Sequence, residues 1–150
     1  MGKQARMTSR PPHILIVEAR FYAEIADMLV EGAEAALNEI GATWERIEVP
    51  GAFEIPATIS FALDRFDGFV ALGCVIRGET THYDYVCSES ARGLQELALH
   101  KRAPIGYGIL TTENLEQAAV RADPKRKDKG RSTVVACLQM IAVKRRFTGA

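Results

Sequence analysis

The 150-residue chain is long enough for one domain with a single hydrophobic core. Apolar residues make up 47% of it and charged residues 25%, close to the averages of folded globular proteins. Nineteen basic residues balance nineteen acidic ones, so the chain has no net positive charge with which to attract a nucleic-acid backbone. We therefore expect no nucleic-acid partner.

The three cysteines, Cys74, Cys87 and Cys137, stand alone in the sequence and form no C-x-x-C pair. This spacing argues against a disulfide framework and against a zinc site, and it is typical of a reducing cytoplasm. We expect a cytoplasmic protein without a metal.

The first residues carry no targeting signal. Residues 1–10 are polar, and the apolar run over 14–17 is far too short for a signal peptide or a membrane span. We expect residues 1–12 to be a disordered tail, residues 13–150 to be a single domain, and the protein to have no membrane partner.

The first half of the chain alternates between short apolar runs and stretches with helical spacing. Residues 13–17 predict a buried strand, which begins after Pro11 and Pro12 because proline cannot donate to a strand ladder. Apolar residues recur at three and four positions from 22 to 40 and predict a long helix. A second, more charged strand follows over 43–49, and a second helix over 54–66.

The second half continues the alternation. Residues 68–75 form the most apolar strand, which predicts burial on both faces. A helix over 83–101 and a strand over 105–110 follow. Strands alternating with helices predict an α/β fold with a parallel sheet covered on both faces, and such sheets bind ligands beyond the carboxyl ends of their strands.

The last part of the chain is helical. Asn114 opens a short helix, with Gln117 as its capping-box partner. A charged loop over 123–130 leads to a final helix over 132–145, with Val135, Leu138, Gln139 and Ala142 on or near one stripe.

Residues 76–82 follow the most apolar strand and open a helix. Gly78 permits a tight turn, and the free N–H groups of the helix start would attract a phosphate or a carboxylate, together with the hydroxyl groups of Thr80 and Thr81. His82 lies in the same turn and could accept a proton from a ligand. Position alone leaves an alternative open, in which a threonine only caps the helix and His82 is a surface histidine.

Two other segments favour an ordinary structural role when each is taken by itself. The turn over 50–56 contains Gly51 and Ala52, which would let a flat ligand approach the backbone, but a plain tight turn with Glu54 at the helix start explains it as well. Phe21 could stack on a heteroaromatic ring, although a hydrophobic staple with Ile25 is the simpler interpretation.

The strand over 105–110 and the short helix after it hold two further candidates. Tyr107 lies between two glycines, which indicates either a close backbone approach or simple packing. Arg121 could bind phosphate oxygens, yet a basic residue at a helix end is also an ordinary dipole partner. The basic run over 125–127 is best explained as a solvated loop.

Taken together, these segments resemble the lumazine synthase family. The resemblance runs from about residue 13 to residue 147 and depends on five ordered segments: 20–21 (RF), 50–56 (PGAFEIP), 73–83 (GCVIRGETTHY), 108–114 (GILTTEN) and 117–122 (QAAVRA). Residues 73–83 are the most specific of them.

The resemblance implies a flavodoxin-like three-layer sandwich with a four-stranded parallel sheet, and a defined reaction. The family condenses 5-amino-6-(D-ribitylamino)uracil with 3,4-dihydroxy-2-butanone 4-phosphate to give 6,7-dimethyl-8-ribityllumazine, phosphate and water in riboflavin biosynthesis, and it uses no metal or redox cofactor.

The resemblance also implies residue roles. His82 would transfer protons. The keto-phosphate would be held by Glu79, Thr80 and Arg121. The uracil and ribityl groups would be bound by Phe21, Ala52, Phe53, Glu54, Cys74, Val75, Ile76 and Tyr107. Cys74 stands where threonine is common in the family, and Tyr107 where phenylalanine is usual.

The resemblance further implies a homo-oligomer with active sites between adjacent subunits. We expect a pentamer rather than a sixty-subunit shell. Pro11 and Pro12 interrupt strand pairing ahead of the first strand. The loop over 123–130 carries Pro124 and basic residues in place of the glycines of shell-forming members, and symmetry would bring these like charges together.

Two other functions compete with the enzyme. A phospho-receiver domain on the same fold is excluded, because the most apolar strand has no aspartate at its end and the first strand lacks an acidic pair. A non-catalytic flavin- or lumazine-binding or shell-forming paralogue remains as the alternative, although His82 and Arg121 are both present.

Overall fold

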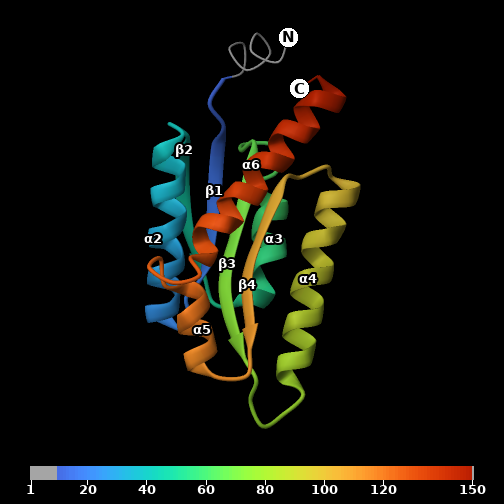
Figure 1. Ribbon diagram of the computed structural model, residues 1–150. Helices are drawn as coiled ribbons and strands as arrows, with labels where there is room; N and C mark the ends of the chain where they lie inside the picture. Colours follow the sequence, from blue (N-terminus) through green and yellow to red (C-terminus); the bar gives the residue numbers. More distant parts are fainter. Residues whose placement is uncertain (1–9, 150) are drawn as a thin grey trace.

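The computed structural model describes residues 10–149 (Figure 1). The elements follow in the order β1 (His13–Ala19), α2 (Ala23–Glu39), β2 (Thr43–Val49), η1 (Ala52–Glu54), α3 (Ile55–Phe61), β3 (Gly68–Ile76), α4 (His82–His100), β4 (Ile105–Thr112), α5 (Leu115–Ala122) and α6 (Lys129–Thr148). We expected a tail over residues 1–12, and its positions 1–9 lie outside the described residues.

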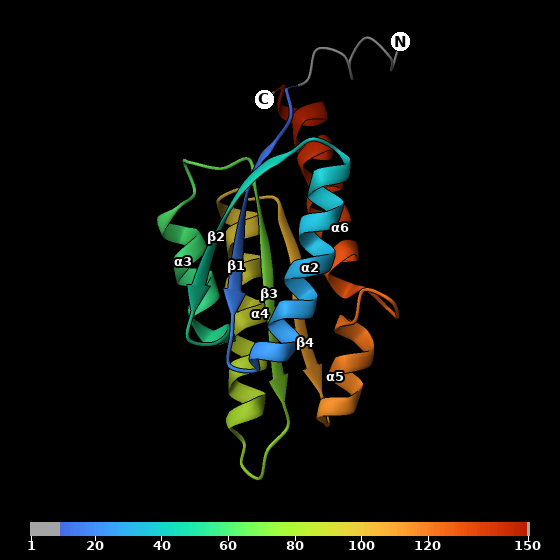
Figure 2. The same cartoon turned by 90° about the vertical axis from the view of Figure 1, so that its left-hand side faces the viewer.

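The four strands form one parallel sheet in the order β2-β1-β3-β4. Helices α3 and α4 lie on one face, and α2, α5 and α6 lie on the other (Figure 2). The predicted three-layer α/β sandwich with a four-stranded parallel sheet is confirmed. All four strands run in the same direction, so the segments that follow them meet at one end of the molecule.

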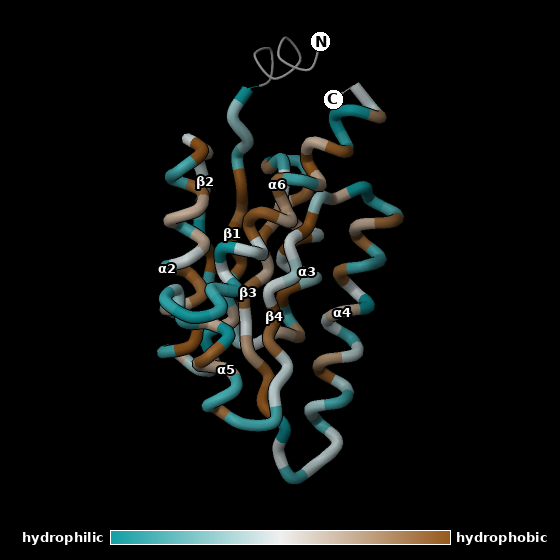
Figure 3. Tube along the Cα trace, in the orientation of Figure 1, coloured by the Kyte–Doolittle hydropathy of each residue, from teal (hydrophilic) through white to brown (hydrophobic). Residues whose placement is uncertain are grey.

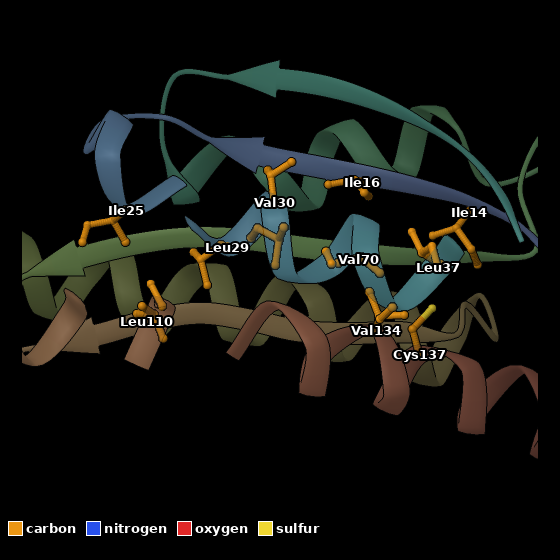
Figure 4. Packing of buried hydrophobic residues seen from close by; sticks show 14 of the residues in the cluster. Ile14, Ile16, Ile25, Leu29, Val30, Leu37, Val70, Leu110, Val134 and Cys137 are labelled. Carbon is orange, nitrogen blue, oxygen red and sulfur yellow. The ribbon is translucent and has the colours of Figure 1, made fainter. Parts of the chain in front are cut away.

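The sheet separates two hydrophobic cores. In β3 the side chains alternate, so that Val70 and Leu72 face α2 and α6 while Phe69 and Ala71 face α3 and α4. Figure 4 shows the first core, with Leu29 of α2 beside the sheet, and Figure 3 shows the apolar residues gathered along the strands. The prediction that this strand is buried on both faces is confirmed.

Glycines allow α6 to approach its neighbours closely. A Cβ atom on Gly106 would lie 2.2 Å from the carbonyl oxygen of Thr133, and one on Gly130 would lie 2.0 Å from the carbonyl oxygen of Leu29. The first contact explains a glycine beside Tyr107 by packing of α6 on β4, without a ligand.

Two predicted helices differ from the observed ones. The helix expected over 54–66 ends at Phe61, where two successive four-residue turns follow, closed by the N–H groups of Ala62 and Arg65. Phe66 lies back at the sheet, and its ring stacks on that of His13 with 4.9 Å between the ring centroids. The final helix begins earlier than predicted, at Lys129, since the Asp128 side chain accepts the N–H of Arg131.

The stripe named from the sequence is not the buried side of α6, although its Leu138 is partly buried. The buried positions of α6 are Gly130, Thr133, Val134, Cys137 and Ile141, whereas Val135 is exposed. The short helix α5 begins as predicted: the Asn114 side chain accepts the N–H of Gln117 at 2.8 Å, and the Gln117 side chain accepts the N–H of Glu113 at 2.8 Å.

Candidate active site

A hollow of about 520 Å³ lies at the carboxyl ends of β1, β2 and β3. In Figure 1 this is the lower end of the sheet, where the arrowheads point. The hollow is lined by Phe21, Tyr22, Gly51, Ala52, Phe53, Glu54, Cys74, Val75, Ile76, His82, Tyr85 and Val86. Eight of the twelve predicted site residues are therefore brought together by one chain.

One wall comes from the turn between β1 and α2. The side chain of Phe21 is 75% exposed, and its ring lies edge-on to that of Tyr22, with 5.0 Å between the ring centroids. Such exposure does not fit a hydrophobic staple on the buried Ile25, which was the simpler interpretation from the sequence. An exposed, flat ring at the rim of a hollow can stack on a ligand instead.

A second wall comes from the turn that follows β2. Gly51 has extended backbone, and Ala52 to Glu54 form the short 3-10 helix η1. Ala52 is buried, whereas Phe53 is largely exposed. The turn therefore presents an aromatic ring and backbone groups to the hollow, with the Glu54 carboxylate beside them.

The end of β3 forms the floor. Cys74, Val75 and Ile76 line it. Burial raises the pKa of the Cys74 thiol to about 11, so the side chain stays protonated near neutral pH. Cys74 therefore serves as a small, largely apolar surface rather than as a nucleophile.

His82 enters the hollow from the first turn of α4. Its backbone N–H donates to the hydroxyl oxygen of Thr80 at 3.3 Å. Thr81 occupies the N-cap position without a side-chain cap hydrogen bond. Thr80 therefore binds one N–H of the helix start from the position before the N-cap, and neither threonine forms a side-chain N-cap. His82 is not simply a surface histidine, because it lines the hollow.

The loop between β3 and α4 is held by Arg77. Its Nε donates to both carboxylate oxygens of Glu113 at 3.1 Å, and its Nη1 lies 3.5 Å from Asp84. Its guanidinium carbon also lies over the ring of Tyr83, 4.4 Å from the ring centroid. Beyond these contacts the loop is exposed, and neither Glu79 nor Thr80 lines the hollow.

Tyr107 and Arg121 also lie outside the hollow of their own chain. Tyr107 projects from β4, the edge strand, and shares the α4 face with Ile109. Arg121 lies in the last turn of α5, where its Nη1 donates to the carbonyl oxygen of Gln117 at 3.0 Å. Within residues 10–149 Arg121 forms no ion pair.

Sequence reasoning missed three lining residues, Tyr22, Tyr85 and Val86, although it had named Gly51 as a position where a ligand could approach the backbone. The signal for two of them was present, because residues three and four positions after His82 share its side of a helix. A second hollow, of about 390 Å³, lies at the amino end of β3 near Lys101, Arg102 and Lys144 and contains no predicted site residue.

Two classes of feature are not found in the part of the chain that the structure describes. None of its helices is both long and apolar enough to span a membrane. Among the same residues, no group of histidine, cysteine, aspartate and glutamate side chains has the arrangement of a metal site.

Comparison with known proteins identifies the family. The model of the 6,7-dimethyl-8-ribityllumazine synthase family matches residues 11–145. A 6,7-dimethyl-8-ribityllumazine synthase of Agrobacterium fabrum is 55% identical over 145 residues, covering 92% of this chain and 98% of its own. Those of Bartonella tribocorum and Sphingopyxis alaskensis are 54% identical over 141 residues and 55% over 137, covering 92% and 90% of this chain and 93% and 96% of their own. The chain belongs to the 6,7-dimethyl-8-ribityllumazine synthase family.

Proposed function

We propose that the protein is a 6,7-dimethyl-8-ribityllumazine synthase of riboflavin biosynthesis. It condenses 5-amino-6-(D-ribitylamino)uracil with 3,4-dihydroxy-2-butanone 4-phosphate and releases phosphate and water. The observation that carries the proposal is the hollow at the carboxyl ends of β1 to β3, which Phe21 and His82 both line. We infer the substrates of this hollow from the family to which the chain belongs.

The uracil and its ribityl chain occupy the hollow. Phe21 stacks on the pyrimidine ring, residues 52–54 and 74–76 line the ring and the ribityl chain, and Tyr107 closes the pocket. The mostly apolar lining supports this assignment, because a flat heteroaromatic ring gains from such surfaces.

The keto-phosphate binds beside the start of α4. Glu79 and Thr80 hold it, Arg121 supplies the counter-charge, and the positive end of the helix dipole favours the phosphate. His82, in the first turn of α4, then transfers protons where the two substrates meet.

The chemistry needs positioning more than reactive groups. The amine of the pyrimidine attacks the carbonyl of the keto-phosphate to form an imine and release water, phosphate leaves, and ring closure releases a second water. Holding two reactants together can remove roughly 7–11 kcal/mol of the barrier in the best intramolecular cases. One acid–base group adds about 10²- to 10⁴-fold. No cofactor is needed for these steps.

Formation of the lumazine from both purified substrates tests the proposal. We expect product and phosphate in equal amounts. Binding of the pyrimidine without any turnover would instead identify the non-catalytic flavin- or lumazine-binding or shell-forming paralogue.

We further propose that the protein works in the cytoplasm as a homopentamer with each active site shared between neighbours. In one chain neither Tyr107 nor Arg121 lines the hollow, so a neighbour has to supply them. Large apolar side chains are also exposed on α4 and α6, including Leu99, Val143 and Phe147, and such surfaces are typical of subunit interfaces. A cyclic ring would bring the α5 end of one subunit to the hollow of the next.

Complementation tests the shared site. His82→Ala chains and Arg121→Ala chains are dissociated, mixed and reassembled. Some interfaces then combine an intact His82 with an intact Arg121, and activity should rise above that of either variant alone. No rise, with mixing confirmed by mass spectrometry, would exclude a shared site.

Light scattering tests the assembly. We expect a particle of five subunits, because the loop between α5 and α6 carries Pro124 and a basic run that would meet its own copies in a shell. A particle of capsid size would overturn the pentamer in favour of the sixty-subunit shell.

A further inference from the structure

A buried carboxylate lies directly behind the turn that carries Phe21. Glu18, on β1, is completely buried. It accepts hydrogen bonds from Nε and Nη2 of Arg46 at 2.7 and 3.0 Å, and from Nη1 of Arg20 at 2.8 Å. Burial alone would raise the pKa of Glu18, but the hydrogen bonds from Arg46 and Arg20 outweigh it and hold the pKa below its ordinary value. The carboxylate is therefore charged at neutral pH.

Arg20 connects this carboxylate to the elements around the turn. Besides Glu18, its guanidinium contacts the carboxylate of Asp27 and, at 3.5 Å, the carbonyl oxygen of Ala23, both on α2. Its Nε lies 3.4 Å from the carboxylate of Glu48 on β2. One side chain thus joins β1, α2 and β2 at the end of the sheet that forms the hollow.

Besides Arg20, the turn is held by Tyr22, which packs partly buried against the first core and whose carbonyl oxygen accepts the N–H of Ala26 at 3.0 Å. The exposed ring of Phe21 has its aromatic contact with Tyr22, which belongs to the same turn. Tyr22 occupies the N-cap position of α2 and makes no side-chain cap hydrogen bond. The position of the Phe21 ring therefore depends on the backbone on either side of it. Tyr22 holds the following residue against the core, and Arg20 connects the preceding residue to β1 and β2.

Stability alone gives no reason for a charge at this buried position, because an apolar side chain of similar size can stabilise a protein as well as a buried ion pair. A guanidinium held by several oxygens does, however, allow few positions of the chain that carries it. We propose that Glu18 and Arg20 are positioning residues, which hold the turn so that the ring of Phe21 stands ready to stack on the pyrimidine substrate. This inference rests on the proposed function, which places a pyrimidine against Phe21.

The two arginines offer a matched pair of variants. Both donate to the same carboxylate, but Arg20 adjoins Phe21 while Arg46 lies within β2 and pairs with Glu34 of α2. In Arg20→Lys and Arg46→Lys the charge remains and the forked geometry is lost. Damage to the fold alone would affect the two variants alike.

The probe is 5-amino-6-(D-ribitylamino)uracil alone, measured by calorimetry without the second substrate. We expect Arg20→Lys to weaken its binding by about two- to twelve-fold, the range that a displaced aromatic stacking contact accounts for. Arg46→Lys should stay within about two-fold of the unchanged protein. Equal weakening in both variants would overturn the inference.

A double-mutant cycle asks whether Arg20 acts through the ring. In a Phe21→Ala background the ring is gone, so Arg20→Lys should weaken pyrimidine binding no further. The same loss in both backgrounds would mean that Arg20 affects affinity by another route, and would overturn the inference.

Glu18→Gln keeps the shape of the side chain and removes its charge. It should weaken pyrimidine binding as Arg20→Lys does, again only when Phe21 is present, and unchanged affinity would remove Glu18 from the proposal. If this variant fails to fold, the arginine pair decides the question, because both of its members retain the carboxylate.

The binding assay separates this inference from the proposed function. If the unchanged protein binds the pyrimidine but forms no lumazine, the proposed function fails and the comparison between the arginine variants still decides the inference. If the unchanged protein does not bind the pyrimidine, both fail together.

Discussion

The two sides of the candidate site are held by arginines in different surroundings. On the side proposed to bind the pyrimidine ring, the side chain of Arg20 is 21% exposed and donates to Glu18, whose side chain has no exposed surface. On the side of the loop after β3, Arg77 is 44% exposed, and its partners Glu113 and Asp84 are each 59% exposed. A buried charge left without its partner is costly, whereas an exposed ion pair contributes about 0–1 kcal/mol.

This difference indicates which part of the site one chain can complete. The side proposed to bind the pyrimidine is a hollow whose walls come from the ends of three strands of the same chain. The loop side has Glu79 and Thr80 in an exposed loop, with Arg121 outside the hollow. We infer that the pyrimidine meets a site that is already formed, while the phosphate site depends on the proposed neighbour.

The largest effect is expected on the phosphate side. Arg121→Ala removes the proposed counter-charge and should lower kcat/KM for the keto-phosphate by about 10- to 150-fold, the equivalent of roughly 1.5–3 kcal/mol. Arg126→Ala is the matched control, since it removes an exposed cation from the loop after α5. Steady-state kinetics with each substrate varied measures both. An increase confined to the KM of the uracil would show that the assignment is wrong.

A smaller effect, on kcat, is expected at His82, which lies between the proposed pyrimidine and phosphate sites. His82→Ala should lower kcat by about 10-fold or more and leave the affinity for the pyrimidine nearly unchanged, because it removes proton transfer but leaves Phe21 and residues 52–54 and 74–76 in place. His100→Ala, at the other end of α4, is the control. Turnover equal to that of the unchanged protein would remove His82 from the mechanism.

The sequence predicted the strands and the first helix well, because local patterning determines them. The apolar run of β3 could only be a strand buried on both faces, and it is. Predictions that depended on tertiary contacts did less well. Nothing in the local pattern indicates that Phe66 leaves its helix to stack on His13, or that α6 turns Val134 rather than Val135 toward the sheet.

The candidate site shows the same division. Single segments left most residues undecided between chemistry and packing, and only the resemblance of the ordered segments to the lumazine synthase family assigned them roles. The ion pairs of Glu18 were not visible in the sequence, because Arg46 is 28 residues away and belongs to another strand. The roles of all twelve site residues stay predictions. The structure brings eight of them to one hollow but leaves Glu79, Thr80, Tyr107 and Arg121 outside it.

The exposed ion pairs of Arg77 should contribute less to stability than the buried ones of Glu18. Arg77→Gln should lower the free energy of unfolding by no more than about 1 kcal/mol, because its ion pairs are exposed. Arg92→Gln breaks two exposed ion pairs on α4, with Glu89 and Glu96, and is the matched control for stability. Only Arg77→Gln should also raise the KM for the keto-phosphate, by a few-fold, since Arg77 holds the loop that carries Glu79. Equal kinetics in the two variants would show that this loop needs no anchor.

The smallest effect is expected at Tyr107, whose ring and not its hydroxyl closes the proposed pocket. Burial raises the pKa of this phenol above its ordinary value, so the hydroxyl remains protonated near neutral pH and cannot act as a base. Tyr107→Phe keeps the ring and should leave kcat/KM within about two-fold. Tyr107→Ala removes the ring and should weaken the binding of the pyrimidine by more than this, about two- to twelve-fold, since a stacking contact is lost. A large loss of kcat in Tyr107→Phe would assign chemistry to the hydroxyl, and the loop side would then contribute a reacting group as well as the phosphate contacts.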